Sequence, residues 1–141
     1  MVISSKGRYA LRVMVYLAVN HDGSFIPLKE ISQHEELSQK YLESITRMLS
    51  KAHLIEAASG HGCDYRLTRE REEYNVGEIL KLTEGTLAPV SCLKDDSVPC
   101  DRSELCYTLP IWQGLADLIN NYFDNMTLAD VAGKAEKTVK E

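Results

Sequence analysis

Three cysteines in the C-terminal half are the residues of this sequence best suited to chemistry. Cys92, Cys100 and Cys106 follow a C-x7-C-x5-C spacing. Thiolate sulfur is a soft ligand that suits iron, and a loop can wrap such ligands around an iron–sulfur cluster where a rigid strand could not. Three cysteines are one ligand short of the usual four. The fourth ligand is unassigned, and Asp101, Glu104, a solvent molecule or an exogenous thiol are candidates for it. The pattern therefore predicts a metal site at these cysteines.

Other chemistry is compatible with the same cysteines. They could act as redox-sensing thiols without a metal, hold zinc, or have no functional role. Structural disulfides are disfavoured, because the sequence starts without the apolar core of a signal peptide and lacks the run of about 18 apolar residues that spans a membrane. We therefore expect a cytoplasmic protein with no membrane partner. Cys63 stands apart, either as an oxidation-sensitive thiol or as a small residue in a turn.

A second useful pattern is a helix with one apolar and one polar face. Ser38 can cap this helix, and Leu42, Ile45 and Leu49 lie on its inward face. Its basic side chains suit DNA phosphates, and its other polar side chains suit base edges. With the turn that follows, the candidate DNA-binding residues are Gln39, Lys40, Tyr41, Glu43, Ser44, Arg47, Lys51, Gly60, His61 and Gly62. The alternative is a solvated face of a protein-interaction domain.

The elements around this helix have the outline of a winged helix. The expected elements are helices over residues 6–19, 27–32 and 39–52, and β segments over residues 54–58 and 64–67 that form a hairpin. In such a fold the third helix enters the major groove, and the hairpin, or wing, reaches neighbouring phosphates or the minor groove. Lys6, Arg8 and Arg12 on the first helix are candidates for further contacts with the DNA backbone.

The C-terminal third has the apolar spacing of a helix that pairs with another. From Leu105 to Met126, apolar residues recur in steps of four and three, as in three heptads of an a/d seam. A second stripe beside it consists of Ile111, Leu115, Leu118 and Tyr122. We expect one stripe to pack on its own domain and the other to pair with a second copy, which gives a homodimer. A single long core helix is the alternative.

The remaining segments complete the expected organisation. A short helix is expected over residues 76–82 and an irregular loop over residues 86–103, and Pro110 indicates that the last helix starts near that residue. The expected units are a DNA-binding domain at 1–85, a cysteine-containing sensor loop at 86–107, a dimerisation helix and C-terminal segment at 108–132, and a flexible tail at 133–141.

The length and the charge of the chain limit the number of domains and the place of a DNA-binding surface. The 141 residues, 44% of them hydrophobic, suffice for one domain with an appended element. A net charge of -5 alone argues against a nucleic-acid binder. However, residues 1–70 hold nine Lys or Arg against eight Asp or Glu, whereas residues 71–141 hold seven against thirteen. Any DNA-binding surface therefore belongs in the N-terminal half.

Several motifs occur in the order typical of a known family. They are the segments 4–11, 38–43, 60–62 and 76–79, the three cysteines, Trp112 and the segment 126–130. In this order the sequence resembles, over nearly its whole length, the IscR-like (Rrf-type) family of bacterial winged helix-turn-helix transcription regulators. The resemblance implies a homodimer that represses or activates genes of iron–sulfur assembly, cysteine metabolism or nitrosative stress. Several such proteins hold an iron–sulfur cluster.

The sequence departs from this family in the wing and at the fourth ligand. The family commonly has an arginine before the first wing glycine and Gly-Gly before the tyrosine, where this sequence has Ser59, Cys63 and Asp64. Some relatives complete the cluster with a histidine three residues after the last cysteine, and others with a carboxylate from the partner's first helix. The corresponding residues here are Leu109 and Arg8, and neither can ligate iron.

These observations predict a mainly α fold with a small β hairpin, in which a winged helix-turn-helix domain precedes a long dimerisation helix. The expected function is a homodimeric regulator whose affinity for double-stranded operator DNA is modulated by an iron–sulfur cluster or by the thiol state of the three cysteines. The alternative is a winged-helix interaction module regulated by a partner enzyme, without a cluster. No catalysis is expected, because the histidines are scattered and no Ser/His/Asp set or phosphate-binding loop has supporting context.

Overall fold

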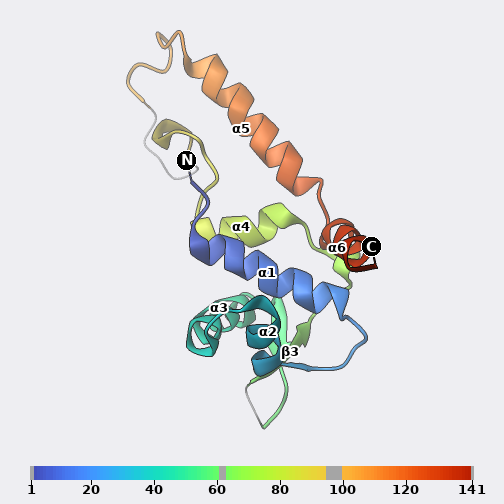
Figure 1. The fold of residues 1–141 in the computed structure, drawn as a ribbon. Helices are drawn as coiled ribbons and strands as arrows, with labels where there is room; N and C mark the ends of the chain where they lie inside the picture. Colours follow the sequence, from blue (N-terminus) through green and yellow to red (C-terminus); the bar gives the residue numbers. More distant parts are fainter. Residues whose placement is uncertain (1, 61–62, 95–99, 141) are drawn as a thin grey trace.

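Six helices and a small antiparallel sheet make up the part of the chain that the computed structural model describes, residues 2–60, 63–94 and 100–140 (Figure 1). The helices are α1 Ser5–Val19, α2 Leu28–Glu35, α3 Gln39–Lys51, α4 Val76–Glu84, α5 Leu109–Asp124 and α6 Leu128–Lys140. The strands are β1 Ile26–Pro27, β2 Ile55–Ala57 and β3 Asp64–Leu67, and short 3-10 helices span Arg71–Glu73 and Ser91–Leu93. None of the helices in these ranges has both the length and the apolar character needed to cross a membrane.

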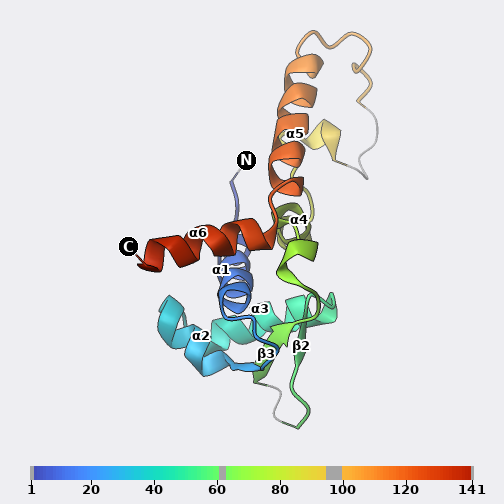
Figure 2. The same cartoon turned by 90° about the vertical axis from the view of Figure 1, so that its right-hand side faces the viewer.

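The other helices of the body pack on α1. Ser4 caps this helix, because its hydroxyl oxygen accepts a hydrogen bond from the Gly7 amide at 3.0 Å. Val13, Met14 and Leu17 follow helical spacing and are at most 1% exposed. α2, α3, α4 and α6 all contact α1, and the two views show it running through the middle of the body (Figures 1 and 2).

α3 begins at the predicted residue. The Ser38 hydroxyl oxygen accepts a hydrogen bond from the Tyr41 amide at 3.1 Å, as expected of its cap. Leu42, Ile45 and Leu49 are fully buried. Because these three residues share one face, the opposite face of α3 is left at the surface.

The expected hairpin is confirmed, and a third strand adds to it. β3 pairs antiparallel with β2, with Leu67 opposite Ile55. β1 pairs with the other edge of β3, with Ile26 opposite Tyr65, so the strand order is β1-β3-β2. Sequence reasoning misses β1 because this strand has only two residues and ends at Pro27, which the pattern assigns to α2 but which is the N-cap of that helix.

The C-terminal region has two helices where the heptad pattern predicts one. α5 has Pro110 in its first turn, as expected, but it ends before Met126, and α6 starts at Leu128. Thr127 and Asp130 cap α6 reciprocally, because the amide of each donates to the side chain of the other at 3.0 Å. This T-x-x-D pattern is readable in the sequence and marks the start of the new helix.

Residues 133–140, which the sequence assigns to a flexible tail, belong to α6. Leu128 and Ala132 are fully buried in the core. Farther along α6, Glu136 pairs with Arg71 at 2.8 Å, and the same Arg71 nitrogen donates to the carbonyl oxygen of Ala18 at the end of α1. The helix is therefore held to the body by apolar burial and by an ion pair.

α5 projects from the body as an arm (Figures 1 and 2). Part of its first apolar stripe, Ile119 and Phe123, packs with Met126 against the buried cluster of Val76, Leu80 and Leu87. The second stripe faces outward, and Ile111, Leu118 and Tyr122 are 60%, 70% and 63% exposed. The expectation that one stripe packs on its own domain is thus confirmed for this end of α5.

Candidate functional site

The outer face of α3 presents every residue that the sequence assigns to it. The exposed side chains are those of Gln39, Lys40, Tyr41, Glu43, Ser44, Arg47 and Lys51. Among the described residues, Lys40, Arg47 and Lys51 form no ion pair with a carboxylate of the same chain. These three cations are therefore available to an anionic partner.

The wing lies beside this face. A hollow of about 300 Å³ lies between them, with Glu43 and Arg47 of α3 on one side and Ala57, Cys63 and Tyr65 of the wing on the other. Gly60, three residues after the end of β2, has a φ of +91°, which favours glycine, and this geometry fits the predicted turn. His61 and Gly62 lie outside the described residues.

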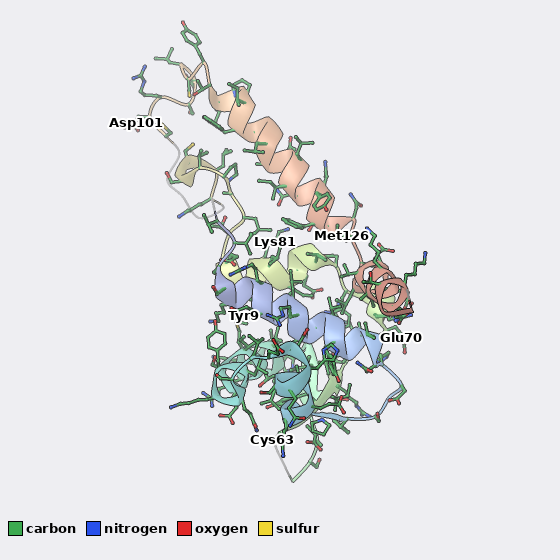
Figure 3. The ribbon with its side chains drawn as sticks, in the orientation of Figure 1. Tyr9, Cys63, Glu70, Lys81, Asp101 and Met126 are labelled. Carbon is green, nitrogen blue, oxygen red and sulfur yellow. The ribbon has the colours of Figure 1, made fainter. Side chains whose placement is uncertain are left out.

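Two aromatic side chains join α3 to α1. The ring of Tyr9, labelled in Figure 3, meets the Tyr41 ring edge to face with the centroids 5.6 Å apart. Tyr41 therefore packs on α1 as well as reaching the surface. The guanidinium of Arg12 lies over the Tyr9 ring, donates to the carbonyl oxygen of Glu35 and pairs with the Glu35 carboxylate at 3.6 Å. Arg12 is therefore engaged within the chain, unlike the cations of α3.

The three cysteines line one hollow of about 280 Å³ where the chain enters α5. Leu93, Ser103, Leu109 and Gln113 complete its wall. In the described ranges, however, no group of three or more His, Cys, Asp or Glu side chains is arranged to hold a metal ion. Cys63 lies at the other end of the molecule from Asp101 of the cysteine segment (Figure 3).

Cys106 differs from an ordinary thiol. Its sulfur lies 3.4 Å from the Thr108 hydroxyl. This hydrogen bond, together with the Thr108 and Leu109 amides and the charge of Arg102, lowers the pKa of the Cys106 thiol below its usual value. More of Cys106 is therefore thiolate at a given pH, and thiolate is the nucleophilic and metal-binding form. The cysteine spacing does not reveal the role of Thr108, although its position two residues after a cysteine is a readable signal.

The structure combines a helix-turn-helix packed on α1, an adjoining wing, and an outward helix face rich in cations. This combination defines the winged helix-turn-helix class of DNA-binding regulators. The chain belongs to the Rrf2 family, described as iron-dependent transcriptional regulators, whose profile matches residues 3–134. It is a DNA-binding transcription regulator and not an enzyme.

Relatives with known names cover nearly the whole chain. The transcriptional regulator IscR of Escherichia coli O1:K1 is 29% identical over 136 residues, which are 96% of this chain and 83% of the relative. CymR, the global cysteine regulator of B. subtilis, has 33% sequence identity with this chain. Its structure gives a TM-score of 0.77 and covers 95% of this chain and 98% of that one. T. potens IscR is 29% identical, with a TM-score of 0.74 over 98% and 90% of the two chains.

Replacing Thr108 should make Cys106 less reactive in the metal-free protein. Because Thr108→Val removes the hydrogen bond that stabilises the thiolate, we expect the pKa of Cys106 to rise and its alkylation by iodoacetamide at neutral pH to slow about twofold or more. Mass spectrometry of each cysteine-containing peptide across a pH series measures this. Cys63 in the same sample is the internal control, and an unchanged Cys106 profile would contradict the assigned cause.

Proposed function

We propose that this chain binds operator DNA as a homodimer through α3 and the wing, and that the state of Cys92, Cys100 and Cys106 sets its affinity. The observation that carries the proposal is the outer face of α3, where seven side chains are exposed and three cations have no carboxylate partner among the described residues. Such a regulator acts in the cytoplasm, where bacterial DNA lies.

The residues on the face divide into two roles. Lys40, Arg47 and Lys51 would contact phosphates, which set affinity and register. Gln39, Glu43 and Ser44 would read base edges in the major groove. Ser44 also donates to the Tyr41 carbonyl oxygen at 2.7 Å, so its hydroxyl can still accept a hydrogen bond from a base. We assign the wing contacts to Gly60, His61 and Gly62.

A second copy would cover the exposed stripe of α5. Leu118 and Tyr122 border an apolar hollow of about 610 Å³ on this helix, continuous with Phe123. Pairing two such stripes buries apolar surface and places two α3 helices on one duplex. Two recognition helices must be about 34 Å apart to enter successive major grooves, so their relative placement determines affinity.

The donor set fits an iron–sulfur cluster in its chemistry but leaves it incomplete. The chain would supply Cys92, Cys100 and Cys106, and Leu109 in the same hollow is apolar. A cluster bound there would supply a redox-active centre. Reversible oxidation of the thiols is the other state that this site can take, and CymR of Staphylococcus aureus, 33% identical, has been solved in an oxidized form.

α4 lies between α5, whose first residues border the cysteines, and α1, which contacts α3. The Glu84 carboxylate at the end of α4 accepts hydrogen bonds from the Ser4 amide and hydroxyl at 2.9 and 2.7 Å. Lys81 of the same helix, labelled in Figure 3, reaches Asp124 of α5 at 3.3 Å. Since α4 contacts both α5 and α1, and α1 contacts α3, a shift of the arm would move the recognition helix. If the arm has two discrete positions, a local change at the cysteines can favour one of them and so alter the affinity for DNA.

Lys40→Ala and Glu43→Ala should weaken DNA binding in different ways. An operator is first selected from a random duplex library, and binding is then measured by fluorescence anisotropy over a salt series. Because a phosphate contact releases counterions, K40A should weaken all duplexes and reduce the salt slope by about 1. E43A should alter the base preference by about 1–3 kcal/mol at one position.

Lys137→Ala on α6 is the matched control, because α6 lies on the opposite side of α1 from α3 (Figure 2). The DNA surface is assigned wrongly if K40A and E43A bind the selected operator as the wild-type chain does.

Leu118→Asp should break the dimer. A carboxylate in an apolar interface loses its hydration without a partner, so we expect the dissociation constant of the dimer to rise about tenfold or more in sedimentation equilibrium. Gln33→Asp introduces the same charge on the exposed face of α2 and should leave the dimer intact. Equal association of L118D and the wild-type chain would refute this interface.

Removing all three thiols should abolish iron binding and make the affinity for the operator independent of exposure to air. After anaerobic purification, C92S/C100S/C106S should contain no iron or acid-labile sulfide, keep the wild-type circular dichroism, and bind the operator equally before and after exposure to air. The fold is expected to survive because no cysteine belongs to the buried core. C63S is the control and should respond as the wild-type chain does. An air-dependent affinity in the triple variant would place the sensor elsewhere.

A further inference from the structure

The phenol of Tyr74 is buried where α3 ends and the wing begins. Its side chain is among the largest that are fully buried, although it carries a polar group. The hydroxyl donates to the Leu54 carbonyl oxygen at 2.6 Å and accepts from the amides of Thr68 and Arg69 at 2.9 and 3.1 Å. The Thr68 hydroxyl also lies 3.1 Å from the phenol oxygen, so groups of this junction surround the Tyr74 hydroxyl.

These bonds join the two ends of the wing to the end of the recognition helix. Leu54 lies between α3 and β2, and its amide donates to the Leu49 carbonyl oxygen within α3 at 3.0 Å. Thr68 and Arg69 directly follow β3. A second bond spans the same junction, since the Thr68 hydroxyl donates to the carbonyl oxygen of His53 at 2.8 Å.

The phenol itself is held in place from the side of α4. The Arg69 guanidinium lies over the Tyr74 ring at 4.2 Å and pairs with Glu78 of α4 at 2.7 Å. It also donates to the Glu73 carbonyl oxygen at 3.0 Å. The ring therefore has little freedom to move, and its hydroxyl is a fixed point for the backbone around it.

The wing depends on this junction because its own pairing is short. β2 and β3 have three and four residues, and three residue pairs hold them together. A ribbon of this length is marginal in isolation, so its direction is set at its base.

We infer that Tyr74 is a positioning residue for DNA recognition: its hydroxyl fixes the angle between the wing and α3, so that both reach one duplex. The inference rests on the proposed DNA contacts of α3 and the wing. Tyr74 itself touches no DNA, because its side chain is fully buried.

The test uses Tyr74→Phe in the full chain. Amide hydrogen exchange at Thr68 and Arg69 should be faster, because their acceptor is gone. Affinity for the selected operator should fall about tenfold, as expected for the loss of buried hydrogen bonds, while affinity for an unrelated duplex, which depends on charge, stays within about twofold. Circular dichroism should be unchanged.

Tyr16→Phe is the matched control. It removes a phenol hydroxyl that donates to Glu30 of α2 at 2.6 Å, away from the wing. Its ratio of operator to unrelated-duplex affinity should equal that of the wild-type chain. The inferred role predicts that this ratio falls only in Y74F, whereas an effect of removing any phenol hydroxyl would lower it in both variants.

A second variant keeps the inference testable if Y74F does not fold. Thr68→Val removes the hydroxyl that donates to His53. It should also lower the ratio of operator to unrelated-duplex affinity, by a smaller factor than Y74F does. An unchanged ratio in the folded variants, or an equal loss in Y16F, overturns the inference while the proposed function stands. A wild-type chain that binds no duplex overturns the proposed function and this inference together.

Discussion

Burial of the apolar residues of α1 is the constraint on which the rest of the structure depends. Residues such as Val13, Met14 and Leu17 have essentially no exposed surface, and α2, α3, α4 and α6 all take part in covering them. Because interiors are packed to near-crystalline density, these helices cannot change position independently of α1. The orientation of α3, and with it the direction of its polar face, follows from this packing.

Sequence alone predicts those features that depend on neighbouring residues. The start of α3 is readable because Ser38 and the spacing of Leu42, Ile45 and Leu49 act within a few turns of one helix. β1 is not readable, because two residues have no periodicity and their pairing with β3 joins segments almost 40 residues apart. The apolar spacing past α5 is misleading, since Met126 continues the repeat although the backbone has already left the helix.

The candidate site also has features that the sequence predicts and features that only the structure reveals. Assigning the exposed residues of α3 needs only the helical period, and the structure places all seven at the surface. The spacing of the cysteines predicts that they act together, and they do share the wall of one hollow. The contribution of Tyr74 depends on tertiary contacts to particular atoms, and no pattern of residue types specifies such contacts. Thr108 acts on a cysteine only two residues away, so its position could be read from the sequence.

The exposed arm has a consequence for how the protein responds to its own abundance. Only the end of α5 near α4 packs on the chain, through Ile119 and Phe123, and a helix gains most of its stability from packing its apolar face. If a second copy supplies the missing contacts, forming the arm and forming the pair become one equilibrium. Order in the arm then rises with cellular concentration, so a newly synthesised chain would become competent for control only after enough copies have accumulated.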